Sequence, residues 1–319
     1  MALLEVENLR KTFGGIVAVD GASFTVEEGT VTGLIGPNGA GKTTTFNCVS
    51  GFYTPDSGEV RYRGTDTQEL MEPSTTERGI WVSSSGIGFG VAGLGVGALA
   101  GLSTAGLAAG AVGGAAVGAG MYAGQESLRA NADRPNRQRP FQLSRAGLVR
   151  TFQITRELQG MSVIENMMLA PKAQRGERLV DTWLRKGAVD DQEESVRERA
   201  EEMLAFLEID HLANEEAGSL SGGQRKLLEL GRVLMTDPEL ILLDEPVAGV
   251  NPTLTRKLLD RIEELRQDGY TFLLIEHDME VIMNVSDTII VMSEGKRLME
   301  GTPSEVQSDE RVVDAYLGG

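Results

Sequence analysis

The run from Gly36 to Thr43 is the part of this chain whose residue types and spacing point most directly to chemistry. It reads Gly-Pro-Asn-Gly-Ala-Gly-Lys-Thr and fits G-x-x-x-x-G-K-[ST], the pattern of loops that cradle nucleotide phosphates. Glycines let backbone N–H groups converge on phosphate oxygens, and a helix starting near Lys42 would point its positive end at the same anion. We expect Lys42 to reach the β- and γ-phosphates and the Thr43 hydroxyl to ligate Mg²⁺.

An ordinary glycine-rich turn is the alternative for this loop. The flanking residues disfavour it, because the apolar residues 31–35 predict a buried strand that enters the loop and residues 44–47 continue as a helix. The expected phosphate-binding residues are Gly36, Pro37, Asn38, Gly39, Ala40, Gly41, Lys42, Thr43 and Thr44.

Two acidic residues far downstream could supply the hydrolytic chemistry. Asp244 and Glu245 follow the apolar run 240–243, which has no polar alternation and so predicts a central parallel strand. Open α/β sheets place their ligand sites at the carboxyl ends of such strands. Asp244 could hold Mg²⁺ through water, and Glu245 could orient and deprotonate an attacking water. Alone, the pair could be a solvated acidic turn, but together with Lys42 it predicts nucleotide hydrolysis.

A third segment, Leu-Ser-Gly-Gly-Gln, precedes an amphipathic helical pattern at 225–230. A serine before two glycines at a helix start is another anion-binding arrangement, although in isolation it could be a plain N-cap. Its place shortly before the Asp244 strand favours anion binding. The residues assigned to it are Ser221, Gly222, Gly223 and Gln224.

In this order, the three segments resemble those of ATP-binding cassette (ABC) ATPases, with ATP and Mg²⁺ as cofactors. The resemblance implies that Gln153 is the glutamine-loop residue, which contacts Mg²⁺ and senses a permease. It implies that His277 is the switch histidine that contacts the γ-phosphate, and that Phe13 stacks on adenine. It further implies a homo- or heterodimer that sandwiches two ATP molecules, so that Ser221 and Gly223 serve the nucleotide of the other subunit.

The closer resemblance is to ATP-binding subunits of branched-chain amino acid importers, over nearly the whole chain. The matching stretches are 46–53, 150–153, 276–279 and 315–318. This implies transmembrane permease subunits as partners, an extracytoplasmic solute-binding protein as an indirect partner, and a place at the cytoplasmic face of the cell membrane. Asn251 departs from the aspartate of many ABC proteins, but this importer subgroup also tends to have asparagine.

Other functions stay open at this point. An importer for another small polar solute, or the ATPase of a lipid or lipopolysaccharide exporter, would share much of the pattern. The stretches 150–153 and 276–279 favour import. A non-catalytic scaffold is disfavoured because the hydrolytic residues are all present, namely Lys42, Asp244, Glu245 and His277.

Composition narrows the class of protein further. The length of 319 residues fits one ABC core with an added segment, and the hydrophobic content of 41% supports a packed core. A formal net charge of −17 makes nucleic acid a poor partner. The single cysteine excludes an intramolecular disulfide, and with two histidines there is no convincing zinc site.

The predicted fold is an α/β P-loop core with an antiparallel β subdomain and a helical subdomain. Its expected parts are residues 1–72 with the β subdomain and phosphate loop, a Gly/Ala-rich insertion at 73–144, the glutamine loop and helical subdomain at 145–235, and the rest of the core at 236–319.

The insertion is the anomalous part, because residues 79–125 contain no charged side chain and have glycines at four-residue spacing. Such spacing lets helices pack closely, and 86–102 and 105–123 could form two short spans of a helical hairpin that enters the membrane. Five arginines between 129 and 145 follow it and favour the cytoplasmic side. A soluble helical pair or a disordered low-complexity loop are the alternatives.

Overall fold

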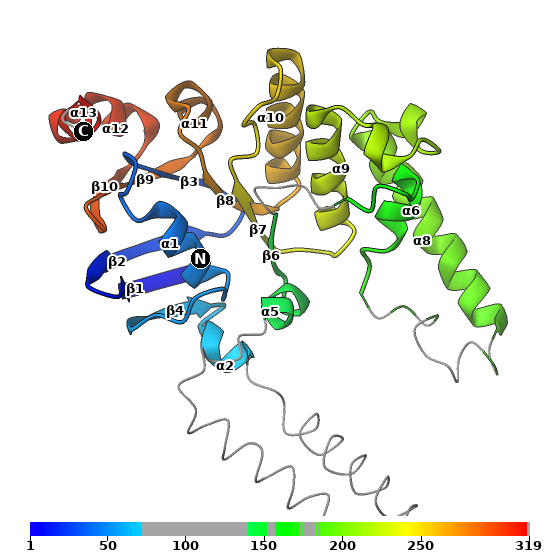
Figure 1. Cartoon of the computed structure of the whole chain (residues 1–319), viewed down its shortest axis with the longest axis horizontal. Helices are drawn as coiled ribbons and strands as arrows, with labels where there is room; N and C mark the ends of the chain where they lie inside the picture. Colours follow the sequence, from blue (N-terminus) through cyan, green and yellow to red (C-terminus); the bar gives the residue numbers. More distant parts are fainter. Residues whose placement is uncertain are drawn as a thin grey trace, which may run out of the picture. The chain divides into compact units, whose positions relative to one another are not determined.

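The computed structural model of the chain is shown in Figure 1 and describes residues 1–71, 140–151, 157–172, 174, 176, 183 and 186–317. The chain divides into two units, one of residues 1–70 and 139–319 and one of residues 71–138. Of the second unit only Met71 is described, so the fold below is that of the first. The predicted hairpin at 79–125 and the predicted glutamine-loop residue Gln153 lie outside the described residues.

An antiparallel sheet is formed mainly by the N-terminal residues, in the strand order β2-β1-β4-β5. Its strands are β1 Ala2–Phe13, β2 Ile16–Glu27, β4 Ser57–Tyr62 and β5 Thr65–Asp66. Leu4, Val6 and Leu9 of β1 are buried, whereas Glu7 and Asn8 are exposed. This pattern is typical of a sheet with one covered face.

A second sheet has the strand order β10-β9-β3-β8-β7-β6 and joins distant parts of the chain (Figure 1). Its strands are β3 Val31–Ile35, β6 Leu148–Arg150, β7 Leu240–Asp244, β8 Thr271–Ile275, β9 Thr288–Ser293 and β10 Lys296–Gly301. All neighbours are parallel except β10, which is antiparallel to β9. Every residue of β3, β7 and β8 is buried, so the buried strands predicted from the apolar runs are confirmed.

The helices of the phosphate-loop half and of the helical subdomain are α1 Lys42–Val49, α2 Thr67–Met71, α5 Pro140–Ala146, α6 Val163–Met168, α8 Lys186–Phe206 and α9 Gly222–Leu234. Those of the C-terminal part are α10 Pro252–Gln267, α11 Met279–Val285, α12 Pro303–Ser308 and α13 Glu310–Leu317. Short 3₁₀ turns lie at Asp210–Leu212 and Ala217–Ser219.

One hydrophobic core runs from the parallel sheet into the helices. Helix α9 contacts α6, α8 and α10, and Figure 1 shows it between α6 and α10. Leu204 of α8, Leu227 of α9 and Met167 of α6 belong to this core together with Ile241 of β7. This arrangement confirms the predicted P-loop core with an antiparallel sheet and a helical region. Among the described residues, no helix combines the length and the apolar character that crossing a bilayer requires.

The register of the parallel strands brings three chain segments to one edge of the sheet. Ile275 of β8 lies opposite both Leu34 of β3 and Asp244 of β7. The segments that follow these strands, the phosphate loop, Glu245 and His277, therefore all leave the sheet at the same edge.

Candidate active site

The loop between β3 and α1 requires glycine at two positions. Gly36 has φ 151° and Gly41 has φ 94°, and residues other than glycine rarely adopt these backbone angles. A Cβ on Gly36 would lie 2.2 Å from the carbonyl oxygen of Met292, and one on Gly41 would lie 2.4 Å from that of Ala18. Backbone of other segments thus packs against the loop and fixes its path.

The first turn of α1 leaves its N–H groups unpaired. Gly41 is the N-cap and offers no side-chain acceptor, and the first turn contains no acidic residue. The N–H of Thr45 donates to the Gly41 carbonyl at 2.9 Å. The N–H groups of Lys42, Thr43 and Thr44 find no acceptor within the described part of the chain. Three donors therefore point out of the helix start, as at an anion site.

Lys42 is folded over the same loop. Its Nζ donates to the carbonyl oxygens of Gly36 at 2.7 Å and Pro37 at 3.0 Å. Burial lowers the pKa of the Lys42 ammonium, and the charge of Glu245 partly offsets this. A half-buried cation beside free N–H groups makes this corner suited to a polyanion.

The two acidic residues differ in their surroundings. Asp244 ends β7 with 4% of its surface exposed, and its Oδ2 accepts a hydrogen bond from Arg150 at 2.8 Å. Glu245 is half-buried and has φ 50°, a left-handed conformation that costs energy for a residue with a side chain. Its N–H donates to the Ile275 carbonyl at 3.0 Å. The strand ends therefore hold Glu245 in a strained conformation, which is common at functional sites.

His277 and a buried carboxylate complete this edge. His277 is exposed, and its Nδ1 lies 3.8 Å from Glu245 Oε1 and 3.8 Å from Glu276 Oε2. Glu276 is buried and accepts hydrogen bonds from the N–H groups of Val247 at 3.1 Å and His277 at 3.3 Å. Burial raises the pKa of the Glu276 carboxyl, while these two donors oppose the rise. Glu276 thus ties the turn after Glu245 to the His277 backbone.

Most of these groups line one cavity of about 530 Å³, whereas Gly36 and Asp244 do not. Its lining combines the phosphate loop, the start of β2 and the ends of β7 and β8: Ile16, Val17, Ala18, Asn38, Gly39, Ala40, Gly41, Lys42, Thr43, Thr44, Glu245, Ile275, Glu276 and His277. Residues from 16 to 277 meet here, so the structure brings together most of the residues that the sequence assigned to phosphate binding and hydrolysis.

Family comparison decides the class of protein. The model of a family described as ABC transporter matches residues 19–87 and 118–248. The chain belongs to this family. The resemblance to ABC ATPases is therefore confirmed. A second family model, described as branched-chain amino acid ATP-binding cassette transporter, matches residues 296–319.

Relatives of the cassette match over its full length. A protein of Archaeoglobus fulgidus named "Probable branched-chain amino acid transport ATP-binding protein LivG" is 34% identical over 322 residues, covering 100% of this chain and 96% of the relative. A nucleotide-free ATP-binding cassette from an ABC transporter has a TM-score of 0.68 at 32% identity, covering 100% of both chains. A cassette solved in its ADP conformation has a TM-score of 0.67 at 32% identity, also covering 100% of both chains.

The Leu-Ser-Gly-Gly-Gln segment of this ABC chain lies outside the cavity lining. Ser221 is the N-cap of α9, and its hydroxyl accepts from the N–H of Gln224 at 3.4 Å while Gln224 Oε1 accepts from the Ser221 N–H at 2.8 Å. A Cβ on Gly223 would lie 2.5 Å from Leu254 Cδ1, whereas Gly222 faces open space. Within one chain, Ser221 is therefore a helix cap and Gly223 a packing residue.

Phe13 also stays outside the cavity lining. Its ring packs edge to face on Tyr53 with centroids 5.2 Å apart, and Lys11 Nζ lies 5.6 Å from the ring centroid. Ile16, Val17 and Ala18 line the cavity instead. The stacking of Phe13 on adenine stays a prediction.

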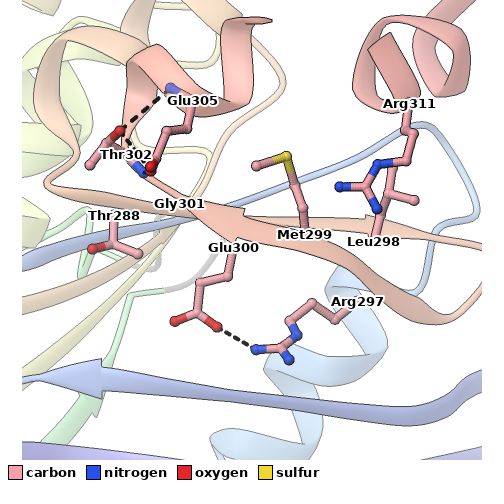
Figure 2. Close-up of a pocket in the computed structure, with 9 residues that line it drawn as sticks. All are labelled: Thr288, Arg297, Leu298, Met299, Glu300, Gly301, Thr302, Glu305 and Arg311. Atoms are coloured by element: carbon pink, nitrogen blue, oxygen red, sulfur yellow. Dashed lines mark hydrogen bonds and ion pairs between the residues drawn. The ribbon is translucent and has the colours of Figure 1, made fainter. Parts of the chain in front are cut away.

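A second hollow, of about 680 Å³, lies between β10, α12 and α13 (Figure 2). Its charged groups pair locally. Arg297 bonds Glu300 at 2.5 Å, Arg311 bonds Asp309 at 2.7 Å, and Glu305 closes the capping box of α12 with Thr302. These contacts stabilise the turn from β10 into the C-terminal helices, and we assign no reaction to this hollow.

Sequence reasoning missed two residues of the site. Arg150 bonds the predicted metal-binding Asp244, and Glu276 connects the segments after β7 and β8. Both end or follow apolar strand residues, and a charged residue at the carboxyl end of a parallel strand is the signal that could have found them.

Proposed function

We propose that this chain is the ATP-hydrolysing subunit of an ABC importer that energises uptake of branched-chain amino acids through partner permeases. The cavity that joins Lys42, the unpaired start of α1, Glu245 and His277 carries the ATPase part of the proposal. The substrate part is supported by the name of the Archaeoglobus relative and by the family model at residues 296–319.

The residues present fit ATP with Mg²⁺. Three N–H groups without an acceptor within the described part of the chain and the Lys42 ammonium provide donors for phosphate oxygens. The Thr43 hydroxyl and the Asp244 carboxylate provide the hard oxygen ligands that Mg²⁺ prefers. Gln153 is a further proposed ligand. When bound, Mg²⁺ neutralises phosphate charge in the transition state.

Three side chains of the cavity then have defined tasks. Lys42 exchanges its bonds to the loop carbonyls for bonds to the β- and γ-phosphates, because a charged acceptor binds the ammonium more strongly. Glu245 accepts the proton of the attacking water. His277 contacts the γ-phosphate from the segment that Glu276 attaches to the Glu245 turn. In this proposal, the bond between the γ-phosphate and the β-phosphate of ATP breaks among these three side chains.

A second cassette, identical or different, completes each site in this proposal. Its Ser221–Gln224 segment would face the γ-phosphate bound by the first chain. The support is that this segment is exposed at Ser221 and Gly222 and lies outside the cavity of its own chain. A helix start of this kind could add donors to the nucleotide from the opposite side.

Membrane attachment at the cytoplasmic face, through the permeases, follows from this function. The uncharged stretch 79–125 is proposed to add a contact to lipid or permease. It overlaps residues 88–117, the gap between the two matches of the ABC transporter model. A variant lacking 79–125 should hydrolyse ATP normally. If the stretch inserts into lipid, full-length protein expressed without permeases should sediment with membranes in high salt and the deletion variant should not.

Uptake of labelled solutes tests the function. A strain lacking this chain should lose uptake of radiolabelled leucine, isoleucine and valine, and the wild-type chain should restore it while the Glu245→Gln chain should not. Lost uptake of a polar solute with normal leucine uptake would assign the chain to another importer. Normal uptake of all solutes with altered membrane lipid would instead support an exporter.

A further inference from the structure

Arg150 forms a charge pair with Asp244 that is shielded from water. It ends β6, which runs parallel to β7 with Arg150 opposite Leu242. Its Nη2 donates to Asp244 Oδ2 at 2.8 Å, and the two side chains are 11% and 5% exposed. Arginine cannot be deprotonated in a protein, so Asp244 always faces a fixed positive charge.

The helix of the phosphate loop holds the same guanidinium. Nη1 of Arg150 donates to Asn47 Oδ1 at 2.6 Å and to Ser50 Oγ at 2.9 Å. The guanidinium carbon lies 4.8 Å from the ring centroid of Phe46 and 5.3 Å from that of Phe52. Two hydrogen bonds and two aromatic rings therefore fix Arg150 independently of Asp244.

This arrangement has consequences for a cation at Asp244. A buried carboxylate is costly unless it is paired, and Arg150 supplies the pairing when no metal ion is bound. A metal ion near the same carboxylate must share it with the guanidinium and is repelled by it, since little water lies between them to screen the charges.

We propose that Arg150 is a positioning residue that stands in for the metal ion at Asp244. It neutralises and orients the carboxylate in the metal-free cassette, and it weakens the affinity of the loaded site for Mg²⁺. This rests on the proposed function, in which Asp244 serves Mg²⁺. The consequence is easier release of ADP with Mg²⁺ after hydrolysis.

The charge of Arg150 at a buried position also supports this role. A packing residue alone would need no charge, because apolar residues fill buried sites at lower cost.

The test compares ADP affinity with Mg²⁺ and with EDTA, and uses the ratio of the two dissociation constants as the readout. Arg150→Met keeps an unbranched apolar stem near Phe46 and Phe52 but removes the charge. Asn47→Ala is the matched control, because it removes one anchor of Arg150 and leaves the pair with Asp244. Arg150→Lys keeps the charge and guards against a misfolded methionine variant.

We expect Arg150→Met to raise the Mg²⁺ preference roughly tenfold, the size of one lost like-charge repulsion at a partly shielded site. Asn47→Ala and Arg150→Lys should lower the melting temperature and leave the ratio near wild type. In an Asp244→Asn background, Arg150→Met should not change the ratio, and it should raise the melting temperature because no unpaired buried charge remains.

An unchanged ratio in Arg150→Met would show a structural cross-link only and overturn the proposal. A lowered ratio would show that Arg150 assists the metal ion, which also overturns it. Failure of the wild-type chain to bind ADP under either condition would instead contradict the proposed ATPase function.

Discussion

Glycine lies at the start of both α1 and α9, as the N-cap Gly41 of α1 and as the first residue Gly222 of α9, yet their first turns are capped in different ways. Gly41 caps α1 without a side chain, and the N–H groups of Lys42, Thr43 and Thr44 have no acceptor among the described residues. Ser221 and Gln224 close a reciprocal capping box at α9. The start of α1 thus has no side-chain acceptor in the described part of its own chain, whereas the capping box supplies one at the start of α9.

The two helix starts also differ in their neighbours. Around α1 lie the ends of β7 and β8 with Glu245 and His277, so the proposed phosphate site and the proposed base lie in one chain. Helix α10 packs against α9, and a side chain at Gly223 would collide with Leu254 of α10. The comparison teaches that a glycine motif at a helix start does not by itself make an anion site, and in our proposal α9 meets nucleotide from a second molecule.

Glu245→Gln should give the largest effect on the α1 side. The amide cannot accept a proton from water, so steady-state ATP hydrolysis should fall roughly 10²–10⁴-fold. ATP affinity should stay near wild type, because the phosphate contacts of Lys42 and α1 remain. Radiolabelled phosphate release and equilibrium ATP binding measure the two quantities, and near-normal hydrolysis would contradict the role of Glu245.

Ser221→Arg tests the α9 side. The variant should lose hydrolysis by roughly 10²–10³-fold, as when one transition-state donor is removed. ATP binding to the isolated subunit should persist, since Ser221 lies outside the cavity of its own chain. Ser162→Ala is a matched control, because Ser162 closes the same kind of capping box at α6. It should cost about 1 kcal/mol of stability and leave hydrolysis unchanged.

Lys42→Ala should weaken nucleotide binding itself. Loss of a hydrogen-bonding charge costs about 1.5–3 kcal/mol, which corresponds to roughly 10- to 100-fold in ATP affinity. Isothermal titration of ATP into the variant measures the change. Unchanged affinity would mean that the ammonium keeps its bonds to Gly36 and Pro37 when nucleotide is present.

Gly223→Ala should have the smallest effect. The added Cβ meets Leu254 at 2.5 Å, and we expect overpacking to cost about 1–3 kcal/mol of folding stability. Gly222→Ala is the matched control, because a Cβ there meets nothing within 4 Å. Thermal unfolding of both variants measures the difference. Equal melting temperatures would show that α9 and α10 can move apart enough to accommodate the added methyl group without loss of stability.

The phosphate loop and the core strands could be predicted from the sequence because their constraints are local. The glycines and lysine at 36–42 fit the pattern of a phosphate-binding loop, and apolar runs such as 240–243 predict strands buried on both faces. Ser221 looked like an anion site from composition. The structure shows its hydrogen bonds with Gln224, which are those of the N-cap that the sequence left as an alternative.

The remaining features depend on contacts between distant residues. Arg150 of β6 reaches Asp244 of the neighbouring β7, and Glu276 after β8 reaches Val247 after β7, so neither bond follows from a local pattern. The left-handed backbone of Glu245 depends in the same way on the bond of its N–H to Ile275. Register and strand order decide these contacts, and single-sequence periodicity does not determine either.

Mixing two inactive chains tests the central claim that each nucleotide site combines α1 of one chain with α9 of another. At an ATP concentration near the wild-type dissociation constant, Lys42→Ala and Ser221→Arg chains should each hydrolyse little ATP alone. Their mixture should regain ATP hydrolysis, because one site of the heterodimer contains only intact parts. A mixture of Lys42→Ala with Glu245→Gln should stay inactive, since both defects lie on the α1 side. Activity equal to the sum of the separate chains in the first mixture would contradict the account.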